Sequence, residues 1–343
     1  MEIDTDQIRK RYSELMPKYQ NLAINLKQAL ELFLHNAGIS YLSIDHRVKD
    51  IDSFIDKISR KKYTNPFDQV EDICGLRIVC YYTSDLEKIC DIIKKEFNII
   101  ESADKEHVLR PDQFGYRSYH FIVKTKGSWL NAPNYRGLEN LTAEIQVRTV
   151  LMHAWAEIEH KLAYKKKIDI PDQFQRKFAM IAAKLEETDQ QFEQLRVDSE
   201  EYRKYLITNA DKADGVFDST LPLNLDNLQA FLGYYFRNQK TAGMQATRSL
   251  LEELIMWGIT MKQLVESYQK VKPFLPQIEE EDFGGEKLGR SMYQQGMARL
   301  ILDLTDDGYF TRHDTTRHLD QSQHKPLPHV EIARKWRKRI REE

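Results

Sequence analysis

The stretch EDICGLRIVCYYTSDLEKICDIIKKEF, residues 71–97, carries the clearest signal for the fold. Its residues Cys74 to Tyr82 form a compact apolar run with the length of a buried strand. Residues Asp85 to Phe97 then show helical spacing, and Ser84 stands where the N-cap of such a helix is expected. A strand that runs directly into a helix is typical of α/β proteins, so the sequence predicts an α/β domain around this unit.

Further elements are predicted on both sides of this unit. Apolar residues recur at three- and four-residue spacing in four segments, which predicts helices over residues 6–33, 51–58, 150–165 and 174–195. Extended segments are predicted over residues 41–48, 119–124 and 141–148. The last of these alternates strictly, so one of its faces is apolar and the other carries Glu144, Gln146 and Arg148. We expect that polar face to line a site.

The length and charge of the chain set limits on its class. It has 343 residues, which at about 150 residues per domain predicts two domains. Hydrophobic residues make up 41% and charged residues 30%, which is typical of a globular protein. Because Lys and Arg number 51 and Asp and Glu 53, the formal net charge is only -2. Any nucleotide site must therefore rest on local patches of charge.

The cysteines and the N-terminal residues bear on the compartment. Cys74, Cys80 and Cys90 lie in apolar stretches without metal-ligand spacing, which predicts reduced, buried thiols and a cytoplasmic location. The first ten residues lack the apolar core of a signal peptide. No run of about 18 apolar residues occurs, so a membrane span is not expected.

A stretch rich in Asp, Gly, Ser and Pro at residues 211–222 predicts a linker between two domains, residues 1–210 and 223–343. Four segments beyond the linker predict an all-helical second domain, namely residues 225–236, 245–257, 260–271 and 288–304. The last segment, Arg334 to Arg341, groups basic residues around Trp336 and Ile340. Such a tail is consistent with binding to nucleic acid or an acidic partner, and also with a solvated chain end.

The first polar cluster follows the extended segment 41–48. Arg47 and Lys49 stand two residues apart, and Ser53, Lys57 and Lys61 recur on one face of the next helix. A surface of this kind can hold a triphosphate. An ordinary charged helix face shows the same pattern, so this cluster alone does not decide between the two.

The second cluster lies at the start of the predicted buried strand. Asp72 precedes the apolar run, and Arg77 interrupts it. An Asp in this place is a good ligand for magnesium, which takes one or two carboxylates together with substrate phosphates. Glu144 is the natural second ligand if its strand is a neighbour of the first. An internal ion pair between Asp72 and Arg77 is the alternative.

The third cluster, RPDQFGYRSYH at residues 110–120, crowds Tyr, Arg, Ser and His where a turn runs into a strand. Aromatic rings stack on nucleobases, and Arg pairs with phosphate through two hydrogen bonds. A tyrosine-rich hairpin without a ligand is the alternative.

Two segments with histidine invite a metal interpretation that the sequence does not favour. His153, Glu157, His160 and Lys161 lie on the predicted helix 150–165, but the His-Glu-x-x-His order of a zinc hydrolase is absent. Packing and supporting roles are favoured for them. His313-Asp314 lies in a polar segment without further ligands and is predicted to be a loop.

Five motifs occur in a fixed order: HRVK, EDICGLR, FGYRSYH, EIQVRT and HAWAEIEHKLAYK, at residues 46–49, 71–77, 114–120, 144–149 and 153–165. Over residues 41–195 this order resembles the synthetase domain of the RelA/SpoT family of alarmone synthetases, and the helix from residue 6 fits the stand-alone small members. The resemblance implies a nucleotidyltransferase-like domain with a mixed β-sheet flanked by helices. It also implies transfer of the β,γ-pyrophosphate of ATP to the 3′-hydroxyl of GDP or GTP, with release of AMP and (p)ppGpp.

Residue by residue, the resemblance implies a donor site, an acceptor site and a bound Mg²⁺. Asp72 and Glu144 would bind the metal, with Glu144 also assisting deprotonation of the acceptor. The donor ATP would be held at its adenine by Arg47 and Arg77 and at its phosphates by Lys49, Ser53, Lys57 and Lys61. The acceptor would be bound by Tyr116, which stacks on guanine, and by Arg117, His120, Gln146 and Arg148.

The sequence departs from the family pattern at Asp112, where a Lys commonly follows the proline of the third motif. This charge reversal leaves the acceptor open, because Arg110 either compensates or the acceptor is not a free guanosine nucleotide. Some stand-alone members are toxins that place the pyrophosphate on the 3′ end of tRNA, and the basic tail around Trp336 would suit that activity. A third possibility is an inactive nucleotide-binding module, against which the intact charged residues argue.

The regions outside the synthetase motifs carry two more expectations. Bifunctional family members have a helical His-Asp hydrolase domain before the synthetase, whereas here the first motif already begins at His46, so degradation of the product is not expected. Three roles are open for residues 223–343, namely formation of a homo-oligomer, binding of a regulatory protein, and inhibition of a toxic active site in cis. The sequence does not choose among them.

Overall fold

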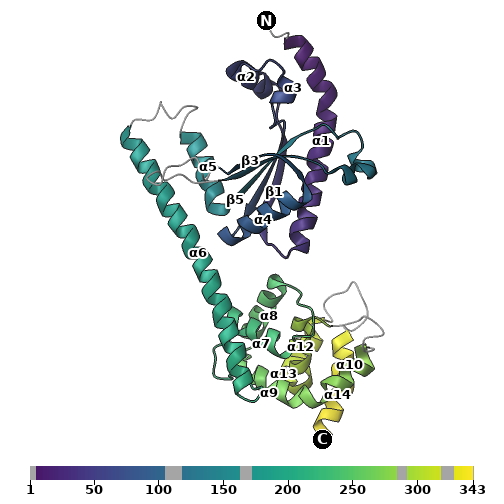
Figure 1. Ribbon diagram of the computed structural model, residues 1–343. Coiled ribbons are helices and arrows are strands. Elements are labelled where there is room, and N and C mark those ends of the chain that lie inside the picture. The colour runs from purple at the N-terminus through teal and green to yellow at the C-terminus, as the bar shows by residue number, and fades with distance from the viewer. Residues whose placement is uncertain (1–4, 105–117, 163–171, 284–291, 318–327, 343) are drawn as a thin grey trace. The chain divides into compact units, whose positions relative to one another are not determined.

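The computed structural model describes residues 5–104, 118–162, 172–283, 292–317 and 328–342 (Figure 1). The chain divides into two compact units, Met1–Leu195 and Arg196–Glu343. This division falls within helix α6 (Asp172–Lys212) and therefore upstream of the linker predicted at residues 211–222. Phe217, inside that predicted linker, is buried in the second unit because its ring packs against Phe231 and Tyr235.

The first unit is built on a mixed five-stranded sheet, which confirms the predicted fold class. Its strands are β1 (Tyr41–Val48), β2 (Cys74–Cys80), β3 (Asn98–Asp104), β4 (Tyr119–Lys124) and β5 (Ala143–Thr149). They lie in the order β1-β2-β5-β4-β3, with β2 and β5 parallel and the other neighbouring pairs antiparallel. Strand β3 was not predicted, because a register shift between Ile99 and Glu101 breaks the alternation that marks a strand.

One face of the sheet is apolar and the other polar. The unit's helices are α1 (Thr5–Asn36), α2 (Ile51–Lys61), α3 (Pro66–Gln69), α4 (Thr83–Glu96) and α5 (Val150–Leu162), with short 3₁₀ turns η2 (Gly127–Asn131) and η3 (Pro133–Tyr135). Leu26 of α1 and Ile89 of α4 share one core with Ile145 of β5. The alternating burial of β5 confirms that Glu144, Gln146 and Arg148 occupy the face opposite this core.

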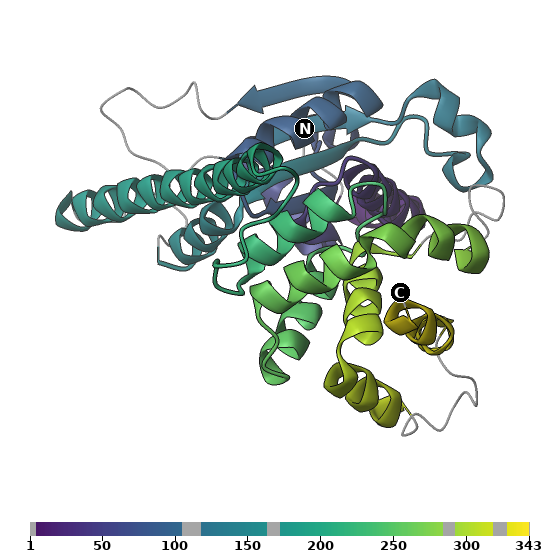
Figure 2. The same cartoon turned by 90° about the horizontal axis from the view of Figure 1, so that it is seen from below.

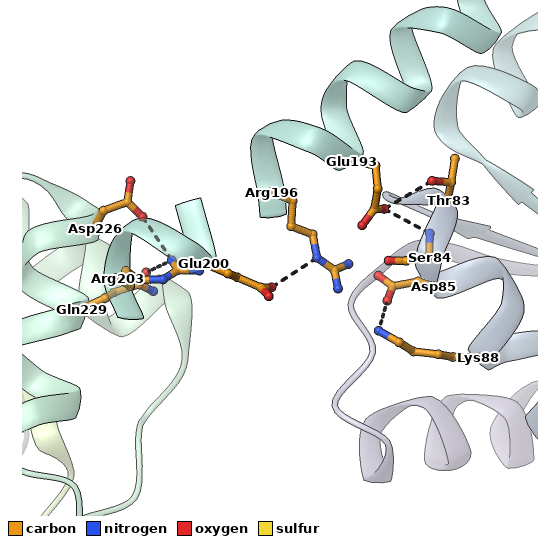
Figure 3. Close-up of polar contacts among 10 residues, drawn as sticks. All are labelled: Thr83, Ser84, Asp85, Lys88, Glu193, Arg196, Glu200, Arg203, Asp226 and Gln229. Atoms are coloured by element: carbon orange, nitrogen blue, oxygen red, sulfur yellow. Dashed lines mark hydrogen bonds and ion pairs between the residues drawn. The ribbon is translucent and has the colours of Figure 1, made fainter. Parts of the chain in front are cut away.

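The N-terminus of α4 differs from the prediction. The helix begins at Thr83 with Tyr82 as N-cap, and no side chain of its own sequence caps it. Glu193 of α6 takes this part instead, because its carboxylate accepts hydrogen bonds from the Ser84 backbone N–H (3.1 Å) and the Thr83 hydroxyl (3.3 Å; Figure 3). The proposed N-cap role of Ser84 was therefore wrong: a carboxylate distant in sequence satisfies the helix end.

The regular elements in the described residues of the second unit are all helices, in agreement with the prediction (Figure 2, green to yellow). Beyond the end of α6 it contains α7 (Leu225–Tyr235), α8 (Met244–Met256), α9 (Met261–Val271), η5 (Lys272–Phe274), α10 (Leu275–Phe283), α12 (Gln294–Thr305), α13 (Asp307–Arg317) and α14 (Pro328–Glu342). Thr260 and Gln263 form a capping box at the start of α9. Part of the predicted helix 288–304 lies outside the described residues, and the described part begins at Gln294.

His313 and Asp314, predicted as a loop, lie within α13. The helix forms because the Asp306 carboxylate accepts a hydrogen bond from the Tyr309 N–H at its first turn, and the Tyr309 side chain is buried. The prediction of a loop was wrong because it relied on the polarity of residues 313–314 and not on the buried residue in the first turn of the helix.

The basic C-terminal segment is a docked helix, which neither interpretation of the sequence anticipated. Trp336 of α14 is 1% exposed and lies in the core of the second unit with Ile332. The Arg337 guanidinium donates to the backbone oxygen of Asp303 and pairs with Asp307. Lys335 also has a carboxylate partner in α10, at 2.8 Å from Glu281. The residues of this segment thus serve in part to pack α14 against the second unit and to form ion pairs within it.

Two further expectations concern burial. Cys74, Cys80 and Cys90 are buried, as predicted, and burial raises the pKa of both Cys74 and Cys80 to about 12. Of the helices in the described parts of the chain, none combines the length and apolarity that crossing a bilayer requires.

Candidate active site

Two lysines from different elements converge on Asp72. Lys49 follows β1 and places its Nζ 3.1 Å from Asp72 Oδ2, and Lys57 of α2 places its Nζ 2.9 Å from Oδ1. All three side chains are largely shielded from solvent, with exposures of 14%, 22% and 19% for Lys49, Lys57 and Asp72. The ion pair between Asp72 and Arg77, which the sequence left open, is replaced by these two contacts.

The first turn of α2 presents Ser53 beside this group. Asp50 is the N-cap of α2, and its carboxylate accepts a hydrogen bond of 2.8 Å from the Ser53 backbone N–H. Hydrogen bonding to Ser53 lowers the pKa of Asp50, so the cap remains ionised. Lys57 lies one turn further along α2, and Lys61 is its last residue. A helix N-terminus with lysines along the same helix provides a surface for anions.

Helix α1 contacts the segment that carries Lys49. The Tyr12 hydroxyl donates a hydrogen bond to the backbone oxygen of Lys49. Burial, together with the charges of Asp50 and Asp72, raises the pKa of Tyr12 to about 12. Tyr12 therefore stays protonated and fixes the chain at Lys49. The sequence had marked this residue only as part of an amphipathic helix.

Arg47 and Arg77 lie on the polar face of adjacent strands. In the sheet register Arg47 stands opposite Gly75, and Arg77 opposite Asp45. A Cβ built on Gly75 would lie 3.5 Å from Cγ of Arg47, so the arginine side chain lies against the glycine. A cleft of about 110 Å³ opens here, lined by Asp45, His46, Arg47, Gly75, Leu76, Arg77, Glu144 and Gln146.

Glu144 lies on β5, directly beside β2, where its register partner is Gly75. Its Oε1 accepts a hydrogen bond of 2.8 Å from Nδ1 of His120 on β4, and its Oε2 accepts one of 3.0 Å from the Gln146 side chain. The second ring nitrogen of His120 lies 2.6 Å from the Ser118 hydroxyl. Because a carboxylate only accepts, the proton on His120 Nδ1 points to Glu144.

A chain of polar contacts continues along β5. The Arg148 guanidinium donates to Gln146 Oε1 at 2.9 Å, and Gln146 in turn donates to Glu144. Burial and then the charge of Arg77 lower the pKa of Arg148, with a smaller effect of Arg47. Three guanidinium groups are therefore crowded on one face of the sheet, as expected of a site that binds phosphates.

The structure adds carboxylates to which the sequence analysis gave no substrate or metal role, although it favoured a packing or supporting role for Glu157. Burial, and then the charge of Glu101, raise the pKa of Glu71, to which Asp72 and Glu144 also contribute. Glu157 of α5 pairs with Arg77 at 3.0 Å. Glu71 stood next to Asp72 in a quoted motif, whereas Glu101 lies on the unpredicted strand β3 and carried no signal.

Four residues named in the sequence analysis belong to a segment that the structure does not describe. Tyr116 and Arg117, together with Arg110 and Asp112, lie outside the described residues. Within the described residues the other predicted site residues lie on β1, α2, β2, β4 and β5, except for Lys49, which directly follows β1, and Asp72, which precedes β2. Their assigned roles stay predictions.

Comparison with known proteins supports the motif assignment. Residues 46–169 match the family model described as the region found in RelA and SpoT proteins. The chain is similar to GTP pyrophosphokinase YwaC of Bacillus subtilis (strain 168), with 32% identity over 166 residues, covering 46% of this chain and 77% of YwaC. It is also similar to GTP pyrophosphokinase YjbM of the same strain, with 27% identity over 186 residues, covering 53% of this chain and 85% of YjbM.

Solved structures give similar matches. A GTP pyrophosphokinase family protein from Streptococcus pneumoniae aligns with 27% identity and a TM-score of 0.47, covering 61% of this chain and 98% of that one. The small alarmone synthetase 1 from Bacillus subtilis bound to its product pppGpp aligns with 26% identity and a TM-score of 0.45, covering 55% and 98%. Because the family model spans all five motifs and YwaC matches over most of its length, the chain belongs to the RelA/SpoT family.

Proposed function

We propose that this protein transfers the β,γ-pyrophosphate of ATP to the 3′-hydroxyl of GDP or GTP, yielding (p)ppGpp and AMP. The observation that carries the proposal is a pair of carboxylates with defined partners. Asp72 pairs with Lys49 and Lys57. Glu144 is held by His120 and lines the same cleft as Arg47 and Arg77. Its family membership and the names of its relatives, both GTP pyrophosphokinases, support it.

The donor ATP is assigned to the side of the site formed by β1, α2 and β2. Arg47 and Arg77 clasp the adenine, since guanidinium planes stack well on aromatic rings. Lys49, Ser53, Lys57 and Lys61 hold the phosphates. Lys49 and Lys57 both form ion pairs with Asp72, so their ammonium groups are already held close together. The phosphates would therefore bind to a pair of cations that is in position before ATP arrives.

Asp72 and Glu144 supply the hard carboxylate oxygens that magnesium prefers, and we assign the ion to them. Within the described residues, no group of three or more His, Cys, Asp and Glu side chains forms a complete cage. Two carboxylates that leave the remaining positions to phosphate and water suit magnesium, which keeps much of its coordination for substrate and solvent. When bound, the ion neutralises charge on the transferring phosphates. Asp72 and Glu144 would hold it.

The acceptor is assigned to the side formed by β4 and β5. His120, Gln146 and Arg148 shape this side of the cleft, and Tyr116 and Arg117 are proposed to complete it. A new bond forms between the acceptor 3′-oxygen and the β-phosphorus, and the bond from that phosphorus to the oxygen of AMP breaks. Glu144 takes the hydroxyl proton, while the His120 N–H holds its carboxylate in place.

The two alternative functions receive less support. The hypothesis of tRNA modification used the basic segment around Trp336 as a binding surface for nucleic acid. In the structure Trp336 is buried and Arg337 has internal partners. An inactive module would not require the charged groups of the polar face, which are costly to bury. Asp112, the residue that departs from the family pattern, lies outside the described residues.

The deciding experiment incubates the purified protein with Mg²⁺ and ATP labelled on its β-phosphate, offering GDP, GTP or deacylated tRNA in separate reactions. Label on GDP or GTP is the expected result, and Glu144→Gln should abolish it. Label on tRNA alone would replace the proposed acceptor. Binding of ATP without transfer to any of the three would identify an inactive module.

A further inference from the structure

Glu157 is an acidic residue at the edge of the proposed donor site that the proposed mechanism does not use. It belongs to α5, which contacts β2 and β5 and so brings its side chain to the polar face of the sheet. Its Oε1 lies 3.0 Å from Nη1 of Arg77, and this contact is both a hydrogen bond and an ion pair. Glu157 therefore touches one of the two arginines assigned to the adenine.

The charge of Glu157 compensates a local excess of positive charge. Arg77 lies close enough to Arg148 to lower its pKa, in addition to the larger effect of burial. Glu157 acts on Arg148 in the opposite direction. Without this carboxylate, the repulsion between the Arg77 and Arg148 guanidinium groups would be less compensated. The Arg77 side chain would also lose the contact that holds it in position.

The contact is also geometrically selective. Nε of Arg77 is buried and makes no hydrogen bond among the described residues. The guanidinium group is therefore held through Nη1, which donates to Glu157. A planar group held at one edge has a defined plane, which matters when that plane must stack on a base. Because the Glu157 side chain is 52% exposed, the pair contributes little to folding stability, so removing it can be tested through ligand binding without unfolding the protein.

We propose that Glu157 is a positioning residue that orients Arg77 for the donor nucleotide without contacting ATP. This inference rests on the proposed function, because it assumes that Arg77 binds ATP. We do not propose this role for Glu159, the second acidic residue of the HAWAEIEH motif. Glu159 lies on the same helix and carries the same charge, but has no ion pair with Arg77.

The test measures equilibrium binding of a non-hydrolysable ATP analogue, α,β-methylene-ATP, together with steady-state kinetics. We expect Glu157→Gln to raise the Kd of the analogue and the KM for ATP about tenfold, because a misplaced binding group loses much of its effect. Turnover at saturating ATP should change less than about twofold. Glu159→Gln should behave as the wild type, and Glu157→Asp should recover part of the affinity.

A double-mutant cycle separates positioning from direct contact. If Glu157 acts through Arg77, then Arg77→Ala and the double variant Arg77→Ala/Glu157→Gln should bind the analogue equally. A further loss in the double variant would mean that Glu157 itself touches ATP, and equal affinity of Glu157→Gln and wild type would mean that it has no part; either result overturns the inference. Wild-type protein that neither binds the analogue nor transfers pyrophosphate would overturn the proposed function, and the inference with it.

Discussion

Asp72 contacts two lysines at once, and both contacts determine what its replacement should do. Asp72→Asn removes a charge assigned to the metal and to the arrangement of Lys49 and Lys57. We expect pyrophosphate transfer to fall by at least about 10²–10³-fold. Asn keeps the shape and volume of Asp, so we expect the variant to stay folded although the two lysines lose the charge of their shared partner.

The measurement pairs the transfer rate with thermal unfolding. Asp56→Asn is the matched control, since Asp56 is an exposed carboxylate of α2 and should tolerate the change. An Asp72→Asn protein with near-normal transfer would remove this residue from the proposed mechanism.

Gly75 is the second residue with a sharp expectation. A methyl group there meets Arg47 at an ordinary contact distance, so Gly75→Ala should leave the KM for ATP within about twofold. Gly75→Val adds branches that need the space of the Arg47 side chain, and we expect KM for ATP to rise about tenfold, equivalent to about 1.4 kcal/mol of donor binding. Equal KM values for the two variants would show that ATP binding does not depend on the position of the Arg47 side chain against Gly75.

At the scale of elements, the N-terminus of α4 depends on α6. Glu193→Ala removes the acceptor for the Ser84 N–H and a negative charge at a helix N-terminus. We expect a loss of about 1 kcal/mol in the unfolding free energy of the first unit. Glu187→Ala, on an exposed position of the same helix, is the control. Denaturant unfolding measures both, and equal stabilities would contradict the capping role.

Elements with a clear local pattern could be predicted from the sequence. The predicted bounds of β1 and β4 agree with the structure, and the polar face of β5 follows from strict alternation. Strand β3 escaped because its register shift disturbs that alternation. The α4 cap and the docking of α14 escaped for another reason, namely that their partners, Glu193 and Asp307, are distant in sequence.

The same distinction holds for the site. The motifs identify which residues belong together, because their spacing places them on strands and helices that meet. They do not determine pairing: Asp72 takes Lys49 and Lys57, while Arg77 takes Glu157. Which cation meets which carboxylate depends on side-chain positions in the folded sheet, and no single segment contains that information.

At the scale of the whole molecule, each unit has its own apolar core. Trp336 is among the largest buried side chains of the second core. We expect Trp336→Ala to destabilise that unit by about 3–5 kcal/mol. Hydrogen exchange should show lost protection in α12 and α14, with the strands of the first unit unchanged. Loss of protection in β2 and β5 as well would show that the two cores unfold together.

The burial of all three cysteines makes site-specific labelling practical. A thiol with a pKa of about 12, as for Cys74 and Cys80, contains almost no thiolate near neutral pH, and only thiolate reacts with maleimides. We expect the native protein to resist such reagents and all of its thiols to react once it is denatured, as mass spectrometry would show. Rapid labelling under native conditions would contradict the burial. A cysteine introduced at an exposed position such as Asp56 would then carry a fluorophore alone, so nucleotide binding could be followed without first removing the natural thiols.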